Sequence, residues 1–384
     1  MRVTMLVRCL AMMRGGGETR HLAWMRELSR MGTEVDVIAG QPLALGGARF
    51  PIEGVKATII RSPYLRDWVY RFQRTRGFGR LTMDALHVDE EWFCRAAWRE
   101  IAARPNPPDI VHAHALYQAA RLRRGSSAVV LNFPGEPNPR YAADIRQADA
   151  LIADGWAARH LPAALGLPVH AVPKGVDVER FRPTGSNLRA ELGLDGKRVI
   201  LSVARFVPIK NVTLLVDAMA IMAERDALAH LLLVGEGPEL RGLRAHVDRL
   251  GLQRRVTFAG HVRHDQLPPF YRTADLFALA SEFDNSPNVV LEAMACGLAV
   301  VATDVGGVSE YVAAVQGGEL VPARDASALA GALGTWLDDA PRRREAAAFN
   351  RQRTVQQFSW RVSAERLLDV YNRVLSAPQQ QASA

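Results

Sequence analysis

The stretch Ser281–Gly297, SEFDNSPNVVLEAMACG, places two acidic residues around a turn that leads directly into an apolar helix. Residues 286–288, Ser-Pro-Asn, are typical of a turn, and the Asn288 side chain is suited to cap the helix that follows. The next residues are too apolar for a surface helix, so Glu292 is a carboxylate in a mostly buried segment and needs a partner. Asp284 and Glu292 form either a binding site or a structural cap and ion pair, and these residues alone leave both open.

Length and composition indicate a globular protein of two domains. At 384 residues the chain is too long for one ordinary core. Its 48% hydrophobic and 23% charged residues exclude an intrinsically disordered protein. Cys9, Cys94 and Cys296 follow no disulfide or metal pattern, which is typical of a reducing compartment. No apolar run reaches about 18 residues, and Arg8 breaks the first, so we expect a cytoplasmic protein without a signal peptide or a membrane span.

The first half of the chain alternates strands and helices. Residues 3–7 predict a buried strand, the glycines at 15–17 stand where it turns into a helix, and residues 35–40 predict the next strand. Glycines at such a turn let a ligand approach the backbone, although they can also simply form the turn. Further strands are predicted at 57–60, 110–113, 129–132 and 150–153. This alternation predicts a parallel sheet whose ligands lie at the carboxyl ends of the strands.

His112 and His114 stand at the end of one predicted strand, in the sequence PDIVHAHAL. Because side chains alternate along a strand, both histidines point to the same face. Two histidines without a third ligand make a poor metal site, so we prefer a packing or substrate-contact role to a metal site. After the next strand, residues 132–139 form a proline-rich loop in which Glu136 is the only ionisable side chain.

The second half of the chain repeats the alternation from Arg198 onward. Arg205 and Lys210 flank the first turn from strand to helix. Two cations beside a helix N-terminus make a phosphate site, although two exposed basic residues near a loop explain them equally well. The glycine turns at 235–237 and 306–307 follow later strands, as does the opening stretch. Because the carboxyl ends of parallel strands meet at one edge, we expect these groups to face one crevice.

The formal net charge of +8 is unevenly distributed. Residues 61–80 contain six arginines and one acid, interleaved with five aromatic residues. Such a segment can bind nucleic acid, an anionic lipid surface or an extended acceptor, or it is a solvated insertion. No nucleic-acid-binding motif accompanies it. The residues that we expect on the acceptor or membrane side are Arg66, Trp68, Arg71, Arg74 and His114.

Many of these motifs resemble, in the same order, those of one known family. They are GGGE at the first turn, PDIVHAH, a VPxGVDxxRFRP linker, ARFVPIKN, LLLVGEGPEL, VTFAGHV, SEFDNSPNVVLEAMACG, VATDVGGVSEYV and a final FSWRVSAERLLDVY helix. The set covers nearly the whole chain and resembles the retaining nucleotide-sugar glycosyltransferases of the family-4 group. The resemblance implies the α/β fold called GT-B, with two Rossmann-like βαβ domains facing an interdomain crevice and a C-terminal helix that crosses back to the first domain.

The resemblance also implies roles for individual residues. Arg205 and Lys210 would hold the donor pyrophosphate and stabilise the departing nucleotide diphosphate, since cleavage of the anomeric C–O bond places negative charge on the leaving phosphate. Glu292 would accept hydrogen bonds from the ribose hydroxyls, and Asp284 would lie against the transferred sugar. The other expected donor-binding residues are Gly16, Gly17, Gly235, Glu236, Val262, Asn285, Ser286, Pro287, Asn288 and Val289. Members of the family retain the anomeric configuration, by front-face attack, and no metal or resident cofactor is expected.

Two positions depart from the family pattern. The first acid of the Glu-x7-Glu motif is Asp284, which is one methylene shorter than Glu, and Glu282 is a second candidate for its role. The histidine of a Thr-x-His loop aligns with Pro134, so that its role is vacant. Glu136 is the nearest polar residue, and we expect Glu136→Gln to lower turnover more than donor affinity.

The motifs also place the domain boundaries. We expect an acceptor-binding domain at residues 1–170, a linker at 171–186 and a nucleotide-sugar-binding domain at 187–357. A crossover helix is expected at 358–376, followed by a disordered tail at 377–384. The linker and the crossing helix would serve as hinges when the domains close over the donor.

The expected activity is metal-independent sugar transfer, with retention, from a nucleotide-diphosphate sugar to a glycan, a lipid-linked acceptor or a small molecule. One alternative is another GT-B activity, such as an epimerase or a phosphorylase that would need a pyridoxal lysine. A second alternative is a non-catalytic nucleotide-sugar-binding protein. We expect peripheral contact with a membrane and no binding to nucleic acid, while the sugar, the nucleotide base and the acceptor stay open.

Overall fold

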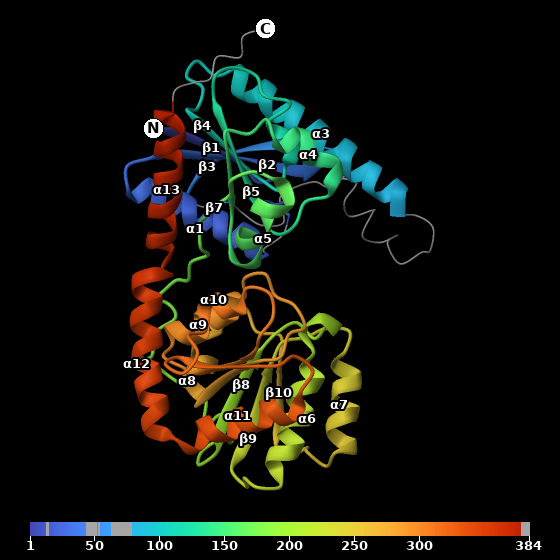
Figure 1. Cartoon of the computed structure of the whole chain (residues 1–384), viewed down its shortest axis with the longest axis vertical. Helices are drawn as coiled ribbons and strands as arrows, with labels where there is room; N and C mark the ends of the chain where they lie inside the picture. Colours follow the sequence, from blue (N-terminus) through green and yellow to red (C-terminus); the bar gives the residue numbers. More distant parts are fainter. Residues whose placement is uncertain (13–14, 44–51, 53, 63–78, 378–384) are drawn as a thin grey trace. The chain divides into compact units, whose positions relative to one another are not determined.

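The computed structural model describes residues 1–12, 15–43, 52, 54–62 and 79–377 of the chain. The chain divides into two compact units (Figure 1). The first unit contains Met1–Pro173 and Ser363–Ala384, and the second contains Lys174–Val362. The boundary after Pro173 falls inside the segment 171–186 in which the sequence predicts a linker.

The first unit is built on a seven-stranded parallel sheet with the strand order β3-β2-β1-β4-β5-β6-β7. The strands are β1 (Arg2–Leu6), β2 (Glu34–Pro42), β3 (Lys56–Ser62), β4 (Ile110–His114), β5 (Ala128–Phe133), β6 (Ala150–Ala153) and β7 (His170–Ala171). The helices are α1 (Gly16–Arg30), α3 (Gly79–Ala102), α4 (Ala142–Ile145), α5 (Gly155–Leu165) and the C-terminal α13 (Trp360–Ser376).

The alternation of side chains along β4 places two kinds of residue on the two faces of this sheet. Val111 and Ala113 pack into a hydrophobic core with residues of α3 such as Phe93 and Trp98. His112 and His114, which occupy the alternate positions, both lie against the ring of His21 on α1, with ring centroids 5.1 and 4.4 Å apart. The two histidines therefore share one face, as their spacing predicts.

The second unit contains a six-stranded parallel sheet with the order β10-β9-β8-β11-β12-β13. Its strands are β8 (Arg198–Val203), β9 (Ala229–Val234), β10 (Val256–Gly260), β11 (Leu276–Leu279), β12 (Val300–Thr303) and β13 (Gly318–Val321). Its helices are α6 (Val212–Ala223), α7 (Leu240–Arg249), α8 (Pro268–Thr273), α9 (Asn288–Ala295), α10 (Val308–Tyr311), α11 (Ala326–Asp338) and α12 (Ala340–Gln357).

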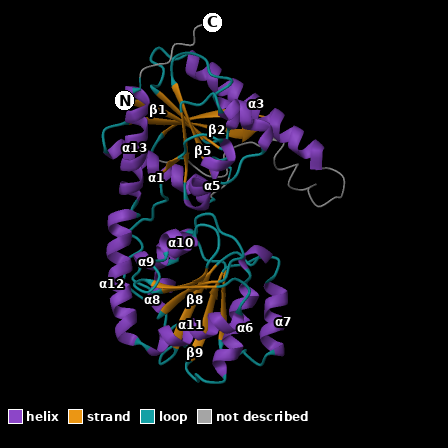
Figure 2. Cartoon of the chain, viewed as in Figure 1, coloured by secondary structure: helices purple, strands orange, loops and turns teal. Residues whose placement is uncertain are grey.

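Helices cover both faces of the second sheet (Figure 2). Ile200 of β8 belongs to a core that includes Leu215 of α6 and Trp336 of α11. The next residue, Leu201, belongs to a second core with Met294 of α9. Strands buried on both faces explain why this half of the sequence reads as nearly continuous apolar runs rather than as alternation.

Each sheet has a position at which the chain reverses the direction in which it adds strands. In the first sheet this reversal lies between β1 and β4, and in the second it lies between β8 and β11. Open parallel sheets bind ligands outside the carboxyl ends of the strands at such a switch point. The glycine turn at residues 15–17 follows β1 and His114 ends β4, while Lys210 follows β8 and Asp284 follows β11.

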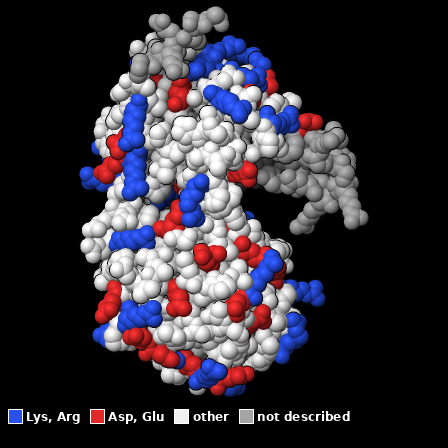
Figure 3. All heavy atoms as spheres, in the orientation of Figure 1, with Lys and Arg blue, Asp and Glu red and all other residues white. Residues whose placement is uncertain are grey.

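Charges of both signs are interspersed on the face of the molecule shown in Figure 3. Arginines of the second unit pair locally with acids, for example Arg263 with Asp265 and Arg324 with Glu282. Arg66, Trp68, Arg71 and Arg74, which the sequence assigns to acceptor or membrane contact, lie outside the described residues. Within the described part of the chain, no helix is long and apolar enough to cross a lipid bilayer.

The three cysteines are all buried. Cys9 is 6%, Cys94 0% and Cys296 5% exposed. Burial raises the pKa of the Cys94 thiol well above its ordinary value and raises the pKa of Cys296 to about 12.

Candidate functional site

Lys210 and Asp284, which are far apart in the sequence, form an ion pair at the carboxyl edge of the second sheet. The distance from Lys210 Nζ to Asp284 Oδ2 is 2.5 Å, and both side chains are mostly buried. The Ser281 hydroxyl donates a hydrogen bond of 3.2 Å to the same carboxylate oxygen. Arg205, in the turn after β8, is exposed, and its side chain has no hydrogen bond or ion pair with any described residue. The edge thus carries one cation held by an acid and one cation facing solvent.

The glycine turn after β9 packs against the backbone that carries Arg205. Gly235 has φ +140°, and a Cβ at this position would lie 1.8 Å from the carbonyl oxygen of Ala204. A Cβ at Gly237 would lie 2.2 Å from the carbonyl oxygen of Phe206. Only glycine allows these close approaches, so the turn at 235–237 braces the Arg205 loop.

A second glycine turn braces Asp284. Gly306 has φ +55°, and a Cβ there would lie 2.0 Å from the Asp284 carbonyl oxygen, which also accepts a 2.8 Å hydrogen bond from the Gly307 N–H. Glu282, the alternative first acid, is exposed and binds Arg324 through both carboxylate oxygens, at 3.0 and 2.9 Å. The acid that contacts Lys210 is therefore Asp284, and the groups predicted at the ends of β8, β9, β11 and β12 are linked through direct contacts.

Glu292 is only 3% exposed and has two protein partners. Its Oε1 lies 2.8 Å from His264 Nε2, and its Oε2 accepts a 2.7 Å hydrogen bond from the Tyr271 hydroxyl. The hydrogen bond with Glu292 raises the pKa of the His264 imidazole. Each carboxylate oxygen keeps a second lone pair, so the carboxylate can still accept a hydroxyl of a ligand.

Sequence reasoning missed His264 and Tyr271. Both lie in the segment HVRHDQLPPFY between β10 and β11, and no spacing rule connects this segment to Glu292. The one available signal was the rule that a buried carboxylate needs a partner. Phe181, in the segment where the linker is predicted, packs on the His264 ring with centroids 5.2 Å apart.

The turn before α9 is held by tertiary contacts rather than by a cap. We expected Asn288 to cap the helix, but this expectation is wrong because Asn288 is its first residue, Pro287 occupies the N-cap position and no side chain caps the end. Ser286 is fixed instead by Lys174 Nζ, which donates 2.8 Å to its carbonyl oxygen, and by the Tyr311 hydroxyl, which lies 2.5 Å from its own hydroxyl. The adjacent Asn285 and Val289 are half-buried.

Two further predicted donor-binding residues lie at the neighbouring strand ends. Glu236, after β9, accepts a 3.3 Å hydrogen bond from the His261 N–H just after β10. Val262 is half-buried and packs against the core on the α9 side of the sheet. The ends of β9 and β10 are therefore joined beside the edge that holds Lys210 and Asp284.

In the first unit, the glycine turn lies against His114. Gly16 is the first residue of α1, and a Cβ at Gly17 would lie 2.5 Å from His114 Nε2. His114 Nδ1 lies 2.8 Å from Asn132 Oδ1 at the end of β5. Glu136 is exposed and has no hydrogen bond or ion pair with a described residue. Of the two side chains predicted near this turn, His114 contacts Gly17 and Glu136 does not, while His21 and Glu18 bond to the Gly17 carbonyl and the Gly15 N–H.

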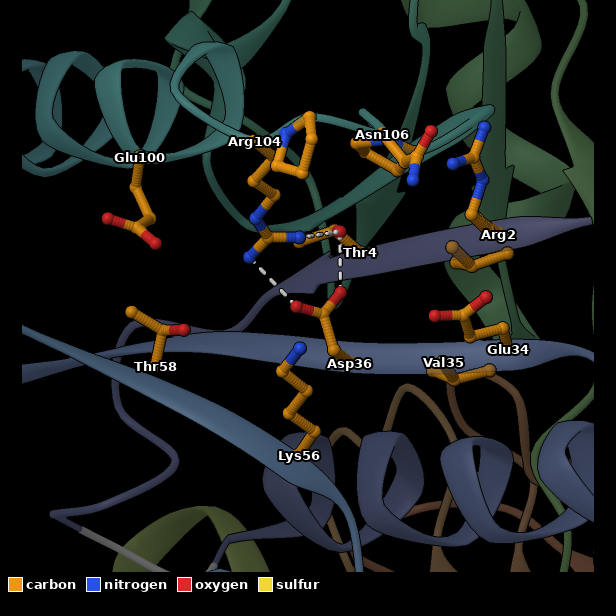
Figure 4. A pocket seen from close by; sticks show the side chains of 13 residues that line it. Arg2, Thr4, Glu34, Val35, Asp36, Lys56, Thr58, Glu100, Arg104 and Asn106 are labelled. Carbon is orange, nitrogen blue, oxygen red and sulfur yellow. Dashed lines mark hydrogen bonds and ion pairs between the residues drawn. The ribbon is translucent and has the colours of Figure 1, made fainter.

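A pocket of about 430 Å³ opens at the opposite, amino-terminal edge of the first sheet (Figure 4). Its central charges are already paired. Asp36 lies 2.8 Å from Arg104 and accepts a 2.6 Å hydrogen bond from the Thr4 hydroxyl. Because ligands of parallel sheets bind at the carboxyl ends of the strands, and these charges satisfy one another, we do not place the functional site here.

Two family profiles match this chain, and the boundary between them lies close to the boundary between the two units. A profile described as Glycosyltransferase Family 4 matches residues 14–180, and one described as Glycosyl transferases group 1 matches residues 186–353. The D-inositol 3-phosphate glycosyltransferase of Jonesia denitrificans is 30% identical over 399 residues, which cover 94% of this chain and 91% of that protein. A GDP-mannose-dependent alpha-(1-6)-phosphatidylinositol monomannoside mannosyltransferase of Mycolicibacterium smegmatis is 30% identical over 209 residues, covering 52% of this chain and 55% of that protein.

The chain is also similar in fold to solved structures over nearly its whole length. The solved structure of sucrose-phosphate synthase from Thermosynechococcus elongatus superposes with a TM-score of 0.77 at 21% identity, over 98% of this chain and 100% of that one. The expectation of two Rossmann-like domains in the GT-B arrangement is confirmed. With a relative matched over nearly its full length and a family profile on each unit, the chain belongs to the family-4 glycosyltransferases.

Proposed function

We propose that this glycosyltransferase takes its sugar from a nucleotide-diphosphate sugar and transfers it with retention of anomeric configuration and without a metal ion. The observation that carries the proposal is the Lys210–Asp284 ion pair, which shares the carboxyl edge of the second sheet with the exposed Arg205. A leaving diphosphate gains negative charge as its bond to the sugar breaks, and fixed cations stabilise that charge. The GDP-mannose dependence of one relative supports this class of donor.

The ion pair gives each partner a role when the donor binds. The diphosphate competes with Asp284 for the Lys210 ammonium, and Arg205 is free to contact the same phosphates. Asp284, released from Lys210, can then accept hydrogen bonds from the sugar hydroxyls. Glu292 accepts from the ribose diol while Tyr271 and His264 keep its carboxylate oriented.

The transfer step that we propose occurs on one face of the sugar. The anomeric C–O bond to the diphosphate breaks with both electrons leaving on the phosphate oxygen, and the acceptor oxygen forms the new bond from the same side. The acceptor proton passes to that departing phosphate oxygen. The acceptor binds to the first unit, near His114, whose Nε2 lies against Gly17 at the start of α1.

A donor panel tests the proposal. The purified protein is incubated with UDP-, GDP- and ADP-sugars in EDTA, and both diphosphate release and thermal stability are measured. One donor class should stabilise the protein and release diphosphate, and NMR of the product should show the anomeric configuration of the donor. Stabilisation without release would favour a non-catalytic binding protein. Loss of activity in EDTA that Mg²⁺ or Mn²⁺ restores would contradict the metal-free mechanism.

The role left vacant by Pro134 is assigned by two variants. If Glu136 fills it, Glu136→Gln lowers kcat and leaves the donor KM unchanged. We expect instead that Glu136→Gln keeps most of the turnover, while His114→Ala lowers kcat on the order of 10²-fold, because His114 lies against Gly17. If His114→Ala kept the kcat of the wild type, the role would belong to Glu136 or to a residue other than these two.

A further inference from the structure

A row of buried side chains connects the C-terminal helix to the glycine turn of the first unit. His112 Nδ1 lies 2.6 Å from the hydroxyl of Tyr371 on α13, and His112 Nε2 lies 3.2 Å from His21 Nε2. His21, in the second turn of α1, has its Nδ1 2.7 Å from the Gly17 carbonyl oxygen. All three side chains are 0% exposed, so the bonds of this row have to be made within the protein.

Both imidazoles of the row are neutral. Burial, helped by the nearby His114 and Arg20, lowers the pKa of His112 to about 3. Burial likewise lowers the pKa of His21 well below its ordinary value, and the Coulombic effects of His114, His112 and Arg20 act in the same direction. A neutral imidazole has one nitrogen that donates and one that accepts, so the proton positions in the row depend on one another.

One arrangement of protons satisfies every bond. The Gly17 carbonyl oxygen can only accept, so His21 donates from Nδ1 and its Nε2 carries no proton. His21 Nε2 then accepts from His112 Nε2–H, which leaves His112 Nδ1 as an acceptor. The Tyr371 hydroxyl donates to that nitrogen. The hydrogen bonds therefore run in one direction, from Tyr371 through His112 and His21 to the Gly17 carbonyl.

We propose that Tyr371 is a positioning residue for the transfer reaction, which acts through His112 to fix the orientation of the His21 ring on which His114 packs. This inference rests on the proposed function, since His114 is placed there beside the acceptor. Gly17 is the second residue of α1, so the helix itself holds its carbonyl oxygen through the His21 N–H, and what the row orients is the His21 ring. Rotation of the His21 ring would remove the packing partner of His114, whose ring centroid lies 4.4 Å away and whose Nε2 lies against Gly17.

The same helix offers a matched control. Ser363, two turns before Tyr371 on α13, accepts a 2.7 Å hydrogen bond from Trp24 Nε1 and donates 2.5 Å to the Pro173 carbonyl oxygen. These bonds fasten α13 to α1 and to the end of the first unit but do not reach the glycine turn. Ser363→Ala therefore weakens the attachment of α13 and releases the Trp24 N–H, whose ring packs 5.2 Å from His21 and 5.6 Å from His112, but it removes no hydrogen bond of the row.

The first measurement determines the proton positions of the two histidines, in the wild type and then in Tyr371→Phe. Nitrogen NMR of the full-length protein labelled with 15N-histidine should show His21 protonated at Nδ1 and His112 protonated at Nε2, both neutral from pH 6 to pH 8. In Tyr371→Phe, His112 loses its donor, and both ring signals should shift. A His21 ring protonated at Nε2, or a charged His112, would overturn the proposal whatever the activity.

The second measurement is kinetic and uses the donor that the wild type accepts. Tyr371→Phe should lower kcat on the order of tenfold with little change in the donor KM, because small misplacement of a reacting group lowers the rate more than the binding. Ser363→Ala should keep kcat even where it lowers Tm by a similar amount. Equal loss of kcat in the two variants would overturn the positioning role. Absence of diphosphate release by the wild type would instead overturn the proposed function, and the histidine spectra would still decide the proton order.

Discussion

Arg205 and Lys210 lie five residues apart on one turn but have different surroundings. Lys210 is occupied by Asp284, whereas the Arg205 side chain is exposed and makes no ion pair with a described residue. An exposed, unpaired side chain contributes little to folding. Replacement of Arg205 should therefore affect donor binding and catalysis while leaving the stability of the fold nearly unchanged.

The first prediction concerns Arg205→Ala. We expect kcat/KM to fall by about 10²-fold or more, because one donor to the developing charge is lost. The free energy of unfolding should change by less than about 0.5 kcal/mol. Steady-state kinetics and urea unfolding measure the two quantities. Arg324→Ala is the matched control, since Arg324 is exposed on the same unit and binds Glu282; a loss of activity as large in this control would contradict a specific role for Arg205.

The sequence predicts which strand ends come together better than it predicts which side chains contact each other there. The proximity of Lys210 and Asp284 follows from the rule that the carboxyl ends of parallel strands meet at one edge. The contacts of Glu292 with His264 and Tyr271 could not be predicted, because they depend on how the segment after β10 folds over α9. The capping role expected for Asn288 failed since the turn is fixed from outside, by Lys174 and Tyr311.

Helix α1 begins with Gly16 and Gly17, and Gly17 leaves no room for a side chain. Alanine usually stabilises a helix relative to glycine, by about 1 kcal/mol. At Gly17, however, the added Cβ would lie 2.5 Å from His114 Nε2. Gly17→Ala should therefore lower kcat markedly while the free energy of unfolding changes little, because the helix gain offsets the cost of moving His114.

The control for this variant is a helix glycine with open surroundings. A Cβ at Gly334, in α11, would meet no atom within 4 Å. Gly334→Ala should thus raise stability and leave kcat unchanged. Kinetics and urea unfolding of both variants provide the comparison. If Gly17→Ala kept full turnover, the close approach of His114 would have no part in the reaction.

Helix α3 carries a pH-dependent element of stability. Glu90 is 6% exposed, and its Oε1 accepts a 2.9 Å hydrogen bond from the Gln118 N–H. Burial raises the pKa of its carboxyl from 4.5 to about 7. The folded protein therefore binds more protons than the unfolded chain between these values, so stability falls as pH rises through this window and is constant above it.

We expect Glu90→Gln to raise the free energy of unfolding at pH 8 by about 3 kcal/mol relative to the wild type, because the variant has no charge to bury. The difference should shrink as the pH approaches 5. Urea unfolding at pH 5 and pH 8 tests this. Glu100→Gln, an exposed position on the same helix, serves as control. A wild type equally stable at both pH values, once the control is subtracted, would contradict the assignment.

Over the whole molecule, the first unit is completed by the end of the chain. Residues 363–384 group with residues 1–173, and α13 buries Leu367, Val370 and Tyr371. Burial of an apolar side chain stabilises by about 1.5–3 kcal/mol. A fragment of residues 1–173 should therefore be several kcal/mol less stable than the same fragment joined by a flexible linker to residues 359–376. Urea midpoints of the two proteins test this, and equal midpoints would show that α13 adds nothing to the first unit.

The fold was predictable from the sequence because the strands of the second sheet are mostly continuous apolar runs and those of the first sheet are mainly apolar segments, separated by helical patterns. The elements that were missed are short. β7, His170–Ala171, has only two residues and no pattern, and β13, Gly318–Val321, reads as the continuation of a glycine turn. The hydrogen-bonded row through His21 and His112 was missed for another reason, since it joins three elements that are distant along the chain.

The burial of the three cysteines has a practical consequence for following this enzyme in motion. Thiol reagents need an accessible thiolate, and the high pKa values of Cys94 and Cys296 add to their lack of access. One cysteine introduced in each unit, for example at the exposed Ala102 and Gln253, should therefore react with fluorescent dyes while the native cysteines remain unlabelled. Energy transfer between the dyes would then record, in single molecules, how the two units respond to each candidate donor.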